Sequence, residues 1–303
     1  MNNLRRTLAI LMALIMVLAL AACGSSQTAA PTATEAPAAA EAEPAAEETA
    51  EEADPLAYLN GQLRVGMECA YAPNNWQESE ATDTNVPIEN VPGAYAEGYD
   101  VQWAKIIADY LGLDLVIIKM DWDGLIPALN AGQIDAIIAG MMDTAARRES
   151  INFSAAYHET QYGMMVLEGS AFADAVSIQD FGGASVLGQK DTALDTVIDQ
   201  IEGVNHLTPV ASVPDMLARL KQGTCDAITV NVENSAAYME ANPEFVLITF
   251  DEGNGFELPA KGACVGIRYE DDVLVEMVNE ALATMDQAAR DVMWATAEAN
   301  APA

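Results

Sequence analysis

Residues 98–157 constrain the fold more than any other part of this 303-residue chain. Within them, stretches with apolar residues three or four positions apart alternate with short runs that are wholly apolar. The first pattern is typical of amphipathic helices, and the second is typical of strands that are buried on both faces of a sheet. Strands and helices in alternation predict a mostly parallel sheet with right-handed crossovers, and therefore an α/β fold.

The chain also contains one internal repeat. Residues 125–138 read LIPALNAGQIDAII and residues 216–229 read MLARLKQGTCDAIT, with five identities in fourteen positions. Each copy fits a helix that ends at a glycine, followed by a turn and a short buried strand. We therefore predict two similar α/β lobes; the alternative explanation is chance, combined with the regularities that any helix, turn and strand share.

The predicted elements divide the folded part into lobe 1 (56–165), lobe 2 (166–258) and a return to lobe 1 (259–303). Strands are expected at 63–67, 115–119, 134–139, 162–167, 184–187, 227–230, 245–250 and 264–267. Helices are expected at 101–111, after Asp121 or Asp123, after Thr144, and at 192–201, 214–222, 235–240, 271–285 and 286–297. Two strands that cross between the lobes would form a hinge, and a ligand would lie between the lobes at the carboxyl ends of the strands.

The first 22 residues have the layout of a secretory signal peptide, with Arg5 and Arg6 before an apolar run. The sequence Leu-Ala-Ala-Cys that ends at Cys23 resembles the bacterial lipobox, in which the cysteine is lipidated. The alternatives are a plain signal peptide or a single membrane anchor. We expect an extracytoplasmic lipoprotein, anchored to the cell membrane by lipid and located in the periplasm if the cell has two membranes.

Residues 23–55 are expected to be a disordered acidic tether. After Cys23, this segment has eight acidic residues and no basic residue, and it consists mostly of Ala, Glu, Pro and Thr. The whole chain has a formal net charge of −33, which argues against nucleic acid as a partner. The cysteines other than Cys23, namely Cys69, Cys225 and Cys264, allow at most one disulfide and show no metal-binding spacing. We expect no metal, no cofactor and a monomer.

Several motifs resemble one known family when their order and spacing are taken together. They are Leu63–Met67 followed by Tyr-Ala-Pro, the sequence GYDV at 98–101, the block 122–138, and Thr144-x-x-Arg147 followed by Phe-Ser. In these motifs the chain resembles the extracellular solute-binding proteins of family 3, which are the amino-acid receptors of ABC importers. The resemblance covers nearly all of 61–297. It implies the two-lobed type II periplasmic-binding fold, with mixed, mostly parallel sheets and a two-strand hinge.

The resemblance also implies a set of ligand-binding residues. Arg147 would bind the ligand's carboxylate, for which a planar guanidinium is well suited, and Thr144 would face the same group. The alternatives are a surface ion pair between Arg147 and Asp143, and a purely structural helix cap at Thr144. Tyr71 would stack on the ligand's side chain, or alternatively serve only in packing, and Glu68 would lie near the ligand's amine or polar end. Thr192, in the loop 189–193, is a candidate from lobe 2; the alternative is a helix cap only.

Two positions, Asn231 and Met142, depart from what the family leads us to expect, and the role of Trp76 is open. Asn231 stands where many relatives have an aspartate that binds the ligand's ammonium, so Glu233 or Glu68 supplies that charge or the ligand is not a simple α-amino acid. Met142 occupies a region where relatives often have small hydroxyl residues, which indicates a less polar ligand; the alternative is a methionine that only packs in the core. Trp76, in the long loop 74–97, either closes over the ligand or covers the core of its own lobe.

We therefore expect a binding protein rather than an enzyme. It would capture an amino acid or a related small carboxylate between its lobes and deliver it to the membrane subunits of an ABC importer. One alternative is an enzyme on the same fold, similar to cyclohexadienyl dehydratases, with His158 or His206 as the acid or base. Another is the ligand-sensing component of a receptor.

Overall fold

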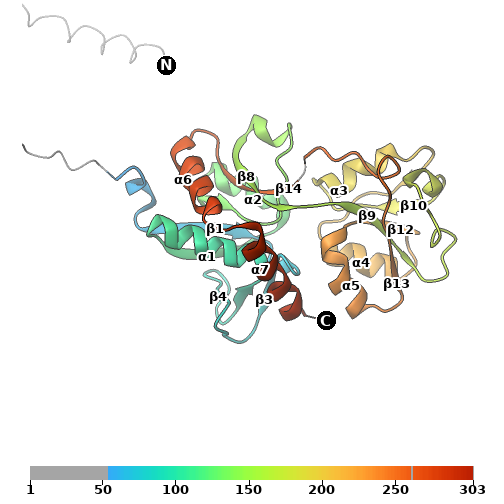
Figure 1. The fold of residues 1–303 in the computed structure, drawn as a ribbon, viewed down its shortest axis with the longest axis horizontal. Coiled ribbons are helices and arrows are strands. Elements are labelled where there is room, and N and C mark those ends of the chain that lie inside the picture. The colour runs from blue at the N-terminus through green and yellow to red at the C-terminus, as the bar shows by residue number, and fades with distance from the viewer. Residues whose placement is uncertain (1–53, 261, 303) are drawn as a thin grey trace, which may run out of the picture. The chain divides into compact units, whose positions relative to one another are not determined.

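The structure, a computed structural model, describes residues 54–260 and 262–302. The predicted signal peptide, Cys23 and all but the last two residues of the predicted tether lie outside these ranges. The described chain forms two lobes, each built on a five-stranded sheet (Figure 1). Among the helices of the described ranges, none is both long enough and apolar enough to cross a membrane.

The first lobe has strands in the spatial order β6-β1-β7-β14-β8. The strands are β1 (Gln62–Met67), β6 (Asp114–Lys119), β7 (Ala136–Ile137), β8 (Ile151–Glu159) and β14 (Gly262–Arg268). The helices are α1 (Tyr99–Leu111), α2 (Leu125–Asn130), α6 (Asp272–Ala283) and α7 (Gln287–Asn300). β1 pairs in parallel with β6 and β7, whereas β14 pairs antiparallel with β7 and β8.

The second lobe repeats this arrangement in the order β11-β10-β12-β9-β13. The strands are β9 (Tyr162–Leu167), β10 (Ser185–Leu187), β11 (Asn205–His206), β12 (Ala227–Asn231) and β13 (Phe245–Ile248). The helices are α3 (Ala193–Thr196), α4 (Val213–Lys221) and α5 (Ser235–Ala241). In each lobe the fourth strand, β14 or β9, is antiparallel to its neighbours and comes directly from the other lobe, which makes the predicted two-strand hinge.

The two copies of the sequence repeat occupy equivalent places. The first copy forms α2 and β7 beside β1, and the second forms α4 and β12 beside β10. The repeated aspartates also make equivalent bonds: Asp135 accepts a hydrogen bond from the backbone N–H of Arg64 (3.1 Å), and Asp226 accepts one from the backbone N–H of Ser185 (2.7 Å). The prediction of two similar lobes is confirmed at this level of detail.

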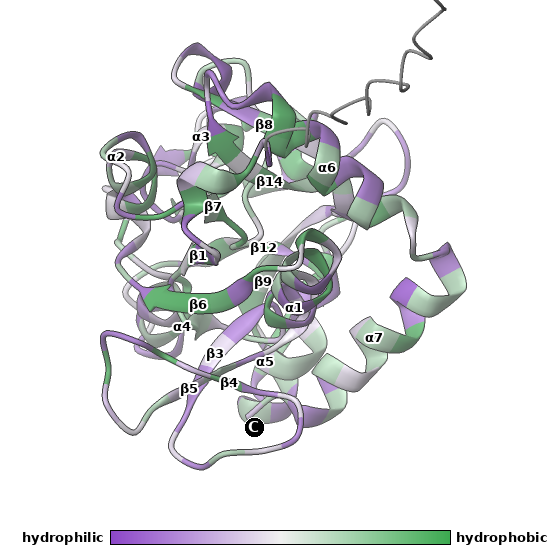
Figure 2. Cartoon of the chain, turned by 90° about the vertical axis from the view of Figure 1, so that its left-hand side faces the viewer, coloured by the Kyte–Doolittle hydropathy of each residue, from purple (hydrophilic) through white to green (hydrophobic). Residues whose placement is uncertain are grey.

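Apolar side chains cover both faces of the second sheet. Met164 and Val166 lie in one apolar cluster while Met165 lies in another, because successive side chains of a strand point to opposite faces. In the first lobe, α1 buries Val101, Ala104 and Ile107 completely. Figure 2 shows the apolar colour along β6 and β7, whereas α7 is mixed, and its buried residue is Ala297.

Four predicted features of the fold need correction. The predicted boundary at residue 165 falls inside β9, which pairs with β12 and β13, so lobe 2 begins at about Tyr162. The helix predicted after Thr144 is a single 3-10 turn, Arg147–Glu149, because the long strand β8, which was not predicted, starts at Ile151. The helix predicted at 192–201 is split into α3 and a 3-10 turn, Val197–Gln200.

The fourth correction concerns the segment predicted as a loop at 74–97. Part of it forms three strands of a small sheet with the order β2-β3-β5-β4, whose strand β2 precedes the segment. The strands of this sheet are β2 (Ala70–Tyr71), β3 (Asn75–Glu78), β4 (Val86–Pro87) and β5 (Tyr95–Glu97). Ile88 and Ala96 of this segment are buried in the apolar core of lobe 1. The remaining 3-10 turns are Ala57–Leu59, Trp122–Gly124, Ile178–Phe181 and Val232–Asn234.

Candidate functional site

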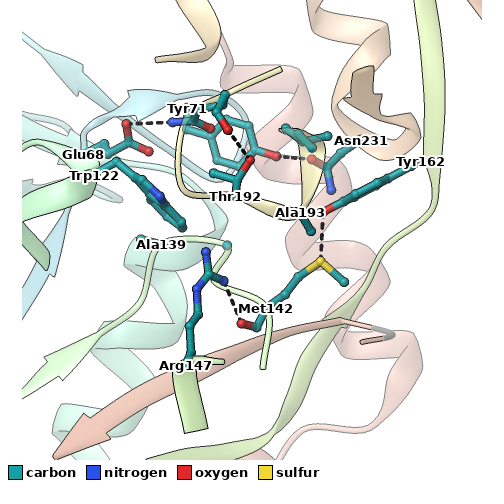
Figure 3. Close-up of a pocket in the computed structure, with 13 residues that line it drawn as sticks. Glu68, Tyr71, Trp122, Ala139, Met142, Arg147, Tyr162, Thr192, Ala193 and Asn231 are labelled. Atoms are coloured by element: carbon teal, nitrogen blue, oxygen red, sulfur yellow. Dashed lines mark hydrogen bonds between the residues drawn. The ribbon is translucent and has the colours of Figure 1, made fainter. Parts of the chain in front are cut away.

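A cavity lies between the lobes, at the carboxyl ends of the central strands of both sheets (Figure 3). It contains about 370 Å³ of space, part of which is open to solvent. Its lining residues are Glu68, Tyr71, Trp122, Ala139, Gly140, Met142, Arg147, Tyr162, Gln189, Thr192, Ala193, Leu194 and Asn231. Because β1, β7, β10 and β12 all end at this place, the topology itself brings the lining residues together.

Arg147 supplies the positive charge of the cavity. Its Nη1 donates to the backbone oxygen of Met142 (2.8 Å) and its Nη2 donates to the backbone oxygen of Asp191 in the other lobe (2.9 Å). A guanidinium has five N–H donors, so these two bonds leave three for a ligand. The guanidinium carbon lies over the ring of Trp122, 5.2 Å from its centre. Burial lowers the pKa of Arg147, but an arginine remains protonated under ordinary conditions.

No carboxylate within residues 54–302 forms an ion pair with Arg147. Asp143, the partner in the alternative interpretation, pairs instead with the next residue, Arg148. Thr144 does not line the cavity; its Oγ1 accepts a hydrogen bond from the backbone N–H of Arg147 (3.4 Å). The helix expected after Thr144 is only a three-residue 3-10 turn, which has too few aligned peptide groups for a helix dipole to attract a carboxylate to Arg147.

Tyr71 and Asn231 join the two lobes at the cavity wall. Tyr71 Oη donates to Asn231 Oδ1 (2.6 Å), and Asn231 Nδ2 donates in turn to Thr160 Oγ1 at the hinge. Burial raises the pKa of Tyr71 well above its ordinary value, so the phenol remains a donor. The backbone of Gly140 comes close to this ring: a Cβ there would lie 3.0 Å from Tyr71 Cε1.

Glu68 is the acidic residue of the lining. Its Oε1 accepts one long hydrogen bond, 3.4 Å, from Nε2 of Gln189 in the other lobe. Burial raises the pKa of Glu68 from 4.5 to about 7; the Gln189 bond opposes the shift and the charge of Asp121 adds to it. No basic side chain of the described chain pairs with this carboxyl group, so a cationic ligand group would relieve its unfavourable burial.

Other lining residues close the space between these groups. Tyr162 Oη lies 2.9 Å from Met142 Sδ, and Trp122 Nε1 donates to the backbone oxygen of Asp191 (3.3 Å). Thr192 Oγ1 donates to the backbone oxygen of Gln189 (2.7 Å), so this hydroxyl stabilises its own loop instead of capping α3.

Apart from Gly140, six residues of the lining were absent from the sequence-based set: Trp122, Ala139, Tyr162, Gln189, Ala193 and Leu194. A signal existed for Trp122, which stands at the start of the block 122–138, and for Gln189 and Ala193, which lie in the loop 189–193. Tyr162 opens a strand, and nothing in the local sequence distinguishes it from a core tyrosine.

Besides Thr144, two predicted site residues, Trp76 and Glu233, lie outside the cavity. Trp76 is 3% exposed and its Nε1 donates to Glu78 Oε1 (2.6 Å), so it covers its own lobe. Glu233 accepts hydrogen bonds from the backbone N–H of Gln161 (2.6 Å) and from Thr160 Oγ1 (3.0 Å). In this conformation, the side chains of Trp76 and Glu233 therefore make structural hydrogen bonds and do not face the cavity.

The two histidines also lie away from the cavity lining. His158 stacks on Trp294 with 4.1 Å between ring centres, and burial lowers its pKa to about 4. His206 lies between Asp195 and Asp199, with each ring nitrogen 2.8 Å from a carboxylate oxygen. Cys69, Cys225 and Cys264 are free and buried.

Comparison with known proteins gives consistent relatives. The family described as bacterial extracellular solute-binding proteins, family 3, matches residues 63–290. A probable histidine-binding protein of Campylobacter jejuni is 28% identical over 218 residues, which are 69% of this chain and 76% of that protein. The arginine-binding extracellular protein ArtP of Bacillus subtilis is 26% identical over 213 residues, which are 66% and 76% of the two chains.

Solved structures agree with this result. The substrate-binding protein of an amino acid ABC transporter superposes with a TM-score of 0.65 at 28% identity, covering 77% of this chain and 97% of that chain. Arginine-bound ArgBP of T. maritima (Gly52Ala mutant) gives a TM-score of 0.64 at 27% identity, with coverages of 77% and 100%. The chain described here therefore has the type II periplasmic-binding fold and belongs to the bacterial extracellular solute-binding proteins of family 3.

Proposed function

We propose that this protein captures an amino acid in the interlobe cavity and delivers it to the membrane subunits of an ABC importer. The observation that carries the proposal is Arg147, a cation in a cavity between two lobes, with three N–H donors to offer and no carboxylate partner in the described chain. A ligand carboxylate would supply that partner through two parallel hydrogen bonds. The histidine- and arginine-binding relatives support an amino acid as the ligand.

The mechanism is closure of two lobes around the ligand. In the open form, the carboxylate binds Arg147 of lobe 1 beside Tyr71 and Trp122. Lobe 2 then closes with the loop 189–193 and Asn231 against the other side of the ligand. Because the ligand contacts lobe 2 only after closure, its binding energy shifts the equilibrium toward the closed form, which the importer would recognise.

The composition of the lining favours binding over catalysis. Arg147, Glu68 and two tyrosines are its ionisable residues, and burial raises the pKa of Tyr71 and Tyr162. Glu68 is the one observation that favours an enzyme, since a carboxyl group with a pKa of about 7 suits general acid–base catalysis. Incubation with prephenate or arogenate, followed by product analysis, tests that candidate: unchanged compounds support the binding protein.

Lipidation of Cys23 would keep the protein at the outer surface of the cell membrane, where an importer can receive the ligand. Metabolic labelling with a fatty-acid analogue tests this part of the proposal. The wild-type protein should carry the label and the Cys23→Ser variant should not. Equal labelling of the two would refute the anchor.

A thermal-shift screen of the common L-amino acids tests the ligand class. A ligand at one hundred times its Kd adds about 2.7 kcal/mol to the free energy of unfolding, which corresponds to a rise in Tm of roughly 5–10 °C. The Arg147→Ala variant should lose the shift, whereas the neighbouring Arg148→Ala variant, which loses only the surface pair with Asp143, should keep it. An amino-acid shift that survives in Arg147→Ala, or none in the wild-type protein, would overturn the proposal.

A further inference from the structure

We propose that the ligand carries its positive charge at the end of a side chain, as a guanidinium or an amine, and that an ammonium next to its carboxylate adds little to binding. This inference rests on the proposed function, because it assumes that the carboxylate binds Arg147. It concerns which class of amino acid or amino-acid derivative the cavity selects.

The cavity has two charged poles. Arg147 and Glu68 are its charged lining residues, and the other eleven are neutral. In Figure 3 the ring of Trp122 lies between them. Each pole also has its own hydrogen-bond partners. Arg147 donates to the backbone oxygens of Met142 and Asp191, whereas Glu68 Oε1 accepts a hydrogen bond from Gln189 Nε2 (3.4 Å). We therefore treat them as one site for a carboxylate and another for a cation.

The direct contacts of the Arg147 guanidinium in the described chain include no carboxylate that could pair with an ammonium. In an α-amino acid the ammonium is on the carbon that bears the carboxylate, so it must lie close to Arg147. The contacts of the guanidinium are two backbone oxygens and the ring of Trp122. The carboxylate of Asp191 does not line the cavity; it is 61% exposed and faces Lys190, at 3.4 Å.

The wall contributed by lobe 2 is equally neutral. Asn231 uses its oxygen to accept from Tyr71 and its nitrogen to donate to Thr160, so its amide is already bonded on both sides. Glu233, two residues further on, is held by the hinge backbone at Gln161 and does not line the cavity. An ammonium beside the carboxylate would therefore lose water and gain no charged partner.

The opposite pole is suited to a cation. A second hollow with about 620 Å³ of space shares Glu68 and Trp122 with the cavity. Besides these two, it is lined by Asp121, Asp123, Lys190, Ala211, Ser212 and Asp215. Four acids against one lysine make this hollow negative, so a long cationic side chain that passes Trp122 would enter a favourable field.

Isothermal titration with three probes tests the inference. L-Arginine has both positive groups, 5-guanidinopentanoate lacks the α-ammonium, and L-norvaline lacks the guanidinium. The titrations are run at pH 8, where Glu68 is ionised. We expect L-arginine and 5-guanidinopentanoate to bind within about fivefold of each other, and L-norvaline to bind at least about tenfold more weakly, as expected for the loss of a charge-assisted hydrogen bond.

Two variants test whether Glu68 binds the guanidinium and whether Asn231 is the reason why the α-ammonium adds little to binding. Glu68→Gln should weaken binding of both guanidinium probes by at least about tenfold. The exposed control Glu240→Gln should change neither Kd by more than about twofold. Asn231→Asp should strengthen binding of L-arginine relative to 5-guanidinopentanoate by about tenfold, because it places an anion where an ammonium lacks one. Each variant is first compared with the wild-type protein by Tm, which confirms that it folds.

The outcomes separate this inference from the proposed function. The inference would be overturned if 5-guanidinopentanoate bound more than about tenfold more weakly than L-arginine. It would also be overturned if L-norvaline bound as tightly as L-arginine. Arg147-dependent binding confined to uncharged amino acids would also overturn it while leaving the proposed function intact. If no amino acid binds in an Arg147-dependent way, the proposed function itself fails.

Discussion

Glu68 shows how a single residue of the site can oppose folding. Burial raises the pKa of Glu68 from 4.5 to about 7. Between these two pH values, the folded protein keeps the proton on Glu68, whereas the unfolded chain has lost it. The contribution of Glu68 to stability is therefore present below pH 4.5 and is lost as the pH rises toward 7. A cationic ligand would compensate for this cost in the closed complex.

This pH dependence can be tested by measuring the stability of a variant that lacks the Glu68 carboxyl group. Glu68→Gln should raise the free energy of unfolding of the ligand-free protein at pH 8 by on the order of 1–3 kcal/mol, and should change it little at pH 4.5. Urea denaturation at the two pH values measures both quantities. The buried Asp100, whose pKa is raised to about 6, acts equally in both proteins and cancels in the comparison. The same pH dependence in wild type and variant would contradict this account.

Sequence motifs were most useful for residues whose role depends on the chemistry of their own side chain. Arg147, Glu68 and Tyr71 were predicted from motifs, and the structure brings them into one cavity. Glu233 was weighed as a source of charge because it is close to Asn231 in sequence, but its backbone and hinge contacts direct it elsewhere. The direction of a side chain depends on its tertiary contacts, and the local sequence does not reveal these contacts.

At the level of elements, the repeat places two aspartates in equivalent positions but different surroundings. Asp135 is 1% exposed, and its carboxylate binds Arg64 (2.8 Å) and Arg268 (3.2 Å). Asp226 is exposed, and its side chain accepts a hydrogen bond from Ser185 N. The motif is thus the same, but the energetic importance of its aspartate differs between the lobes.

The two aspartates predict an unequal pair of substitutions. Asp135→Ala should lower the free energy of unfolding by roughly 2–4 kcal/mol, because the buried carboxylate accepts hydrogen bonds from two partly exposed arginines and from the backbone N–H of Arg64. Asp226→Ala should lower it by about 1 kcal/mol, the typical value of one hydrogen bond. Urea denaturation of the two variants, each in the wild-type background, gives the comparison. Equal losses of stability in the two variants would contradict this prediction. They would show that the position in the repeat, and not the surroundings, determines how much each aspartate contributes to stability.

The elements that sequence analysis missed have weak local signals. β8 reads INFSAAYHE, without a continuous apolar run, and it is held by pairing with β14 across two irregularities in register. The strands of the small sheet have two to four residues each, which is too short for a periodic pattern. By contrast, α1 was predicted well, since its apolar face spans three turns and Gly112 ends it with φ of 68°.

On the scale of the whole molecule, the lobes meet on more than one side of the cavity. Arg147 and Trp122 bind the backbone of Asp191. Elsewhere Asn234, which is 2% exposed, donates to Asn74 Oδ1 (2.7 Å) and to the backbone oxygen of Ala72 (3.3 Å). These bonds form between the lobes themselves, so they favour the closed form before any ligand contributes.

Asn234→Ala should therefore shift the ligand-free protein toward the open form. Small-angle X-ray scattering should give a larger radius of gyration for this variant than for wild type, and saturating ligand should reduce the difference. Asn205→Ala is the matched control, because its bond to Ser185 lies within lobe 2. A radius that stays equal to that of wild type would mean that the Asn234 bonds do not hold the lobes together.

The central claim is that Arg147 binds the ligand's carboxylate between the two lobes. A crystal structure of the protein with the amino acid that gives the largest thermal shift tests it most directly. The account predicts the ligand in the cavity, with its carboxylate oxygens within hydrogen-bond distance of the Arg147 guanidinium and the ligand beside Trp122 and Tyr71. A ligand bound elsewhere, or one whose carboxylate makes no contact with Arg147, would contradict it.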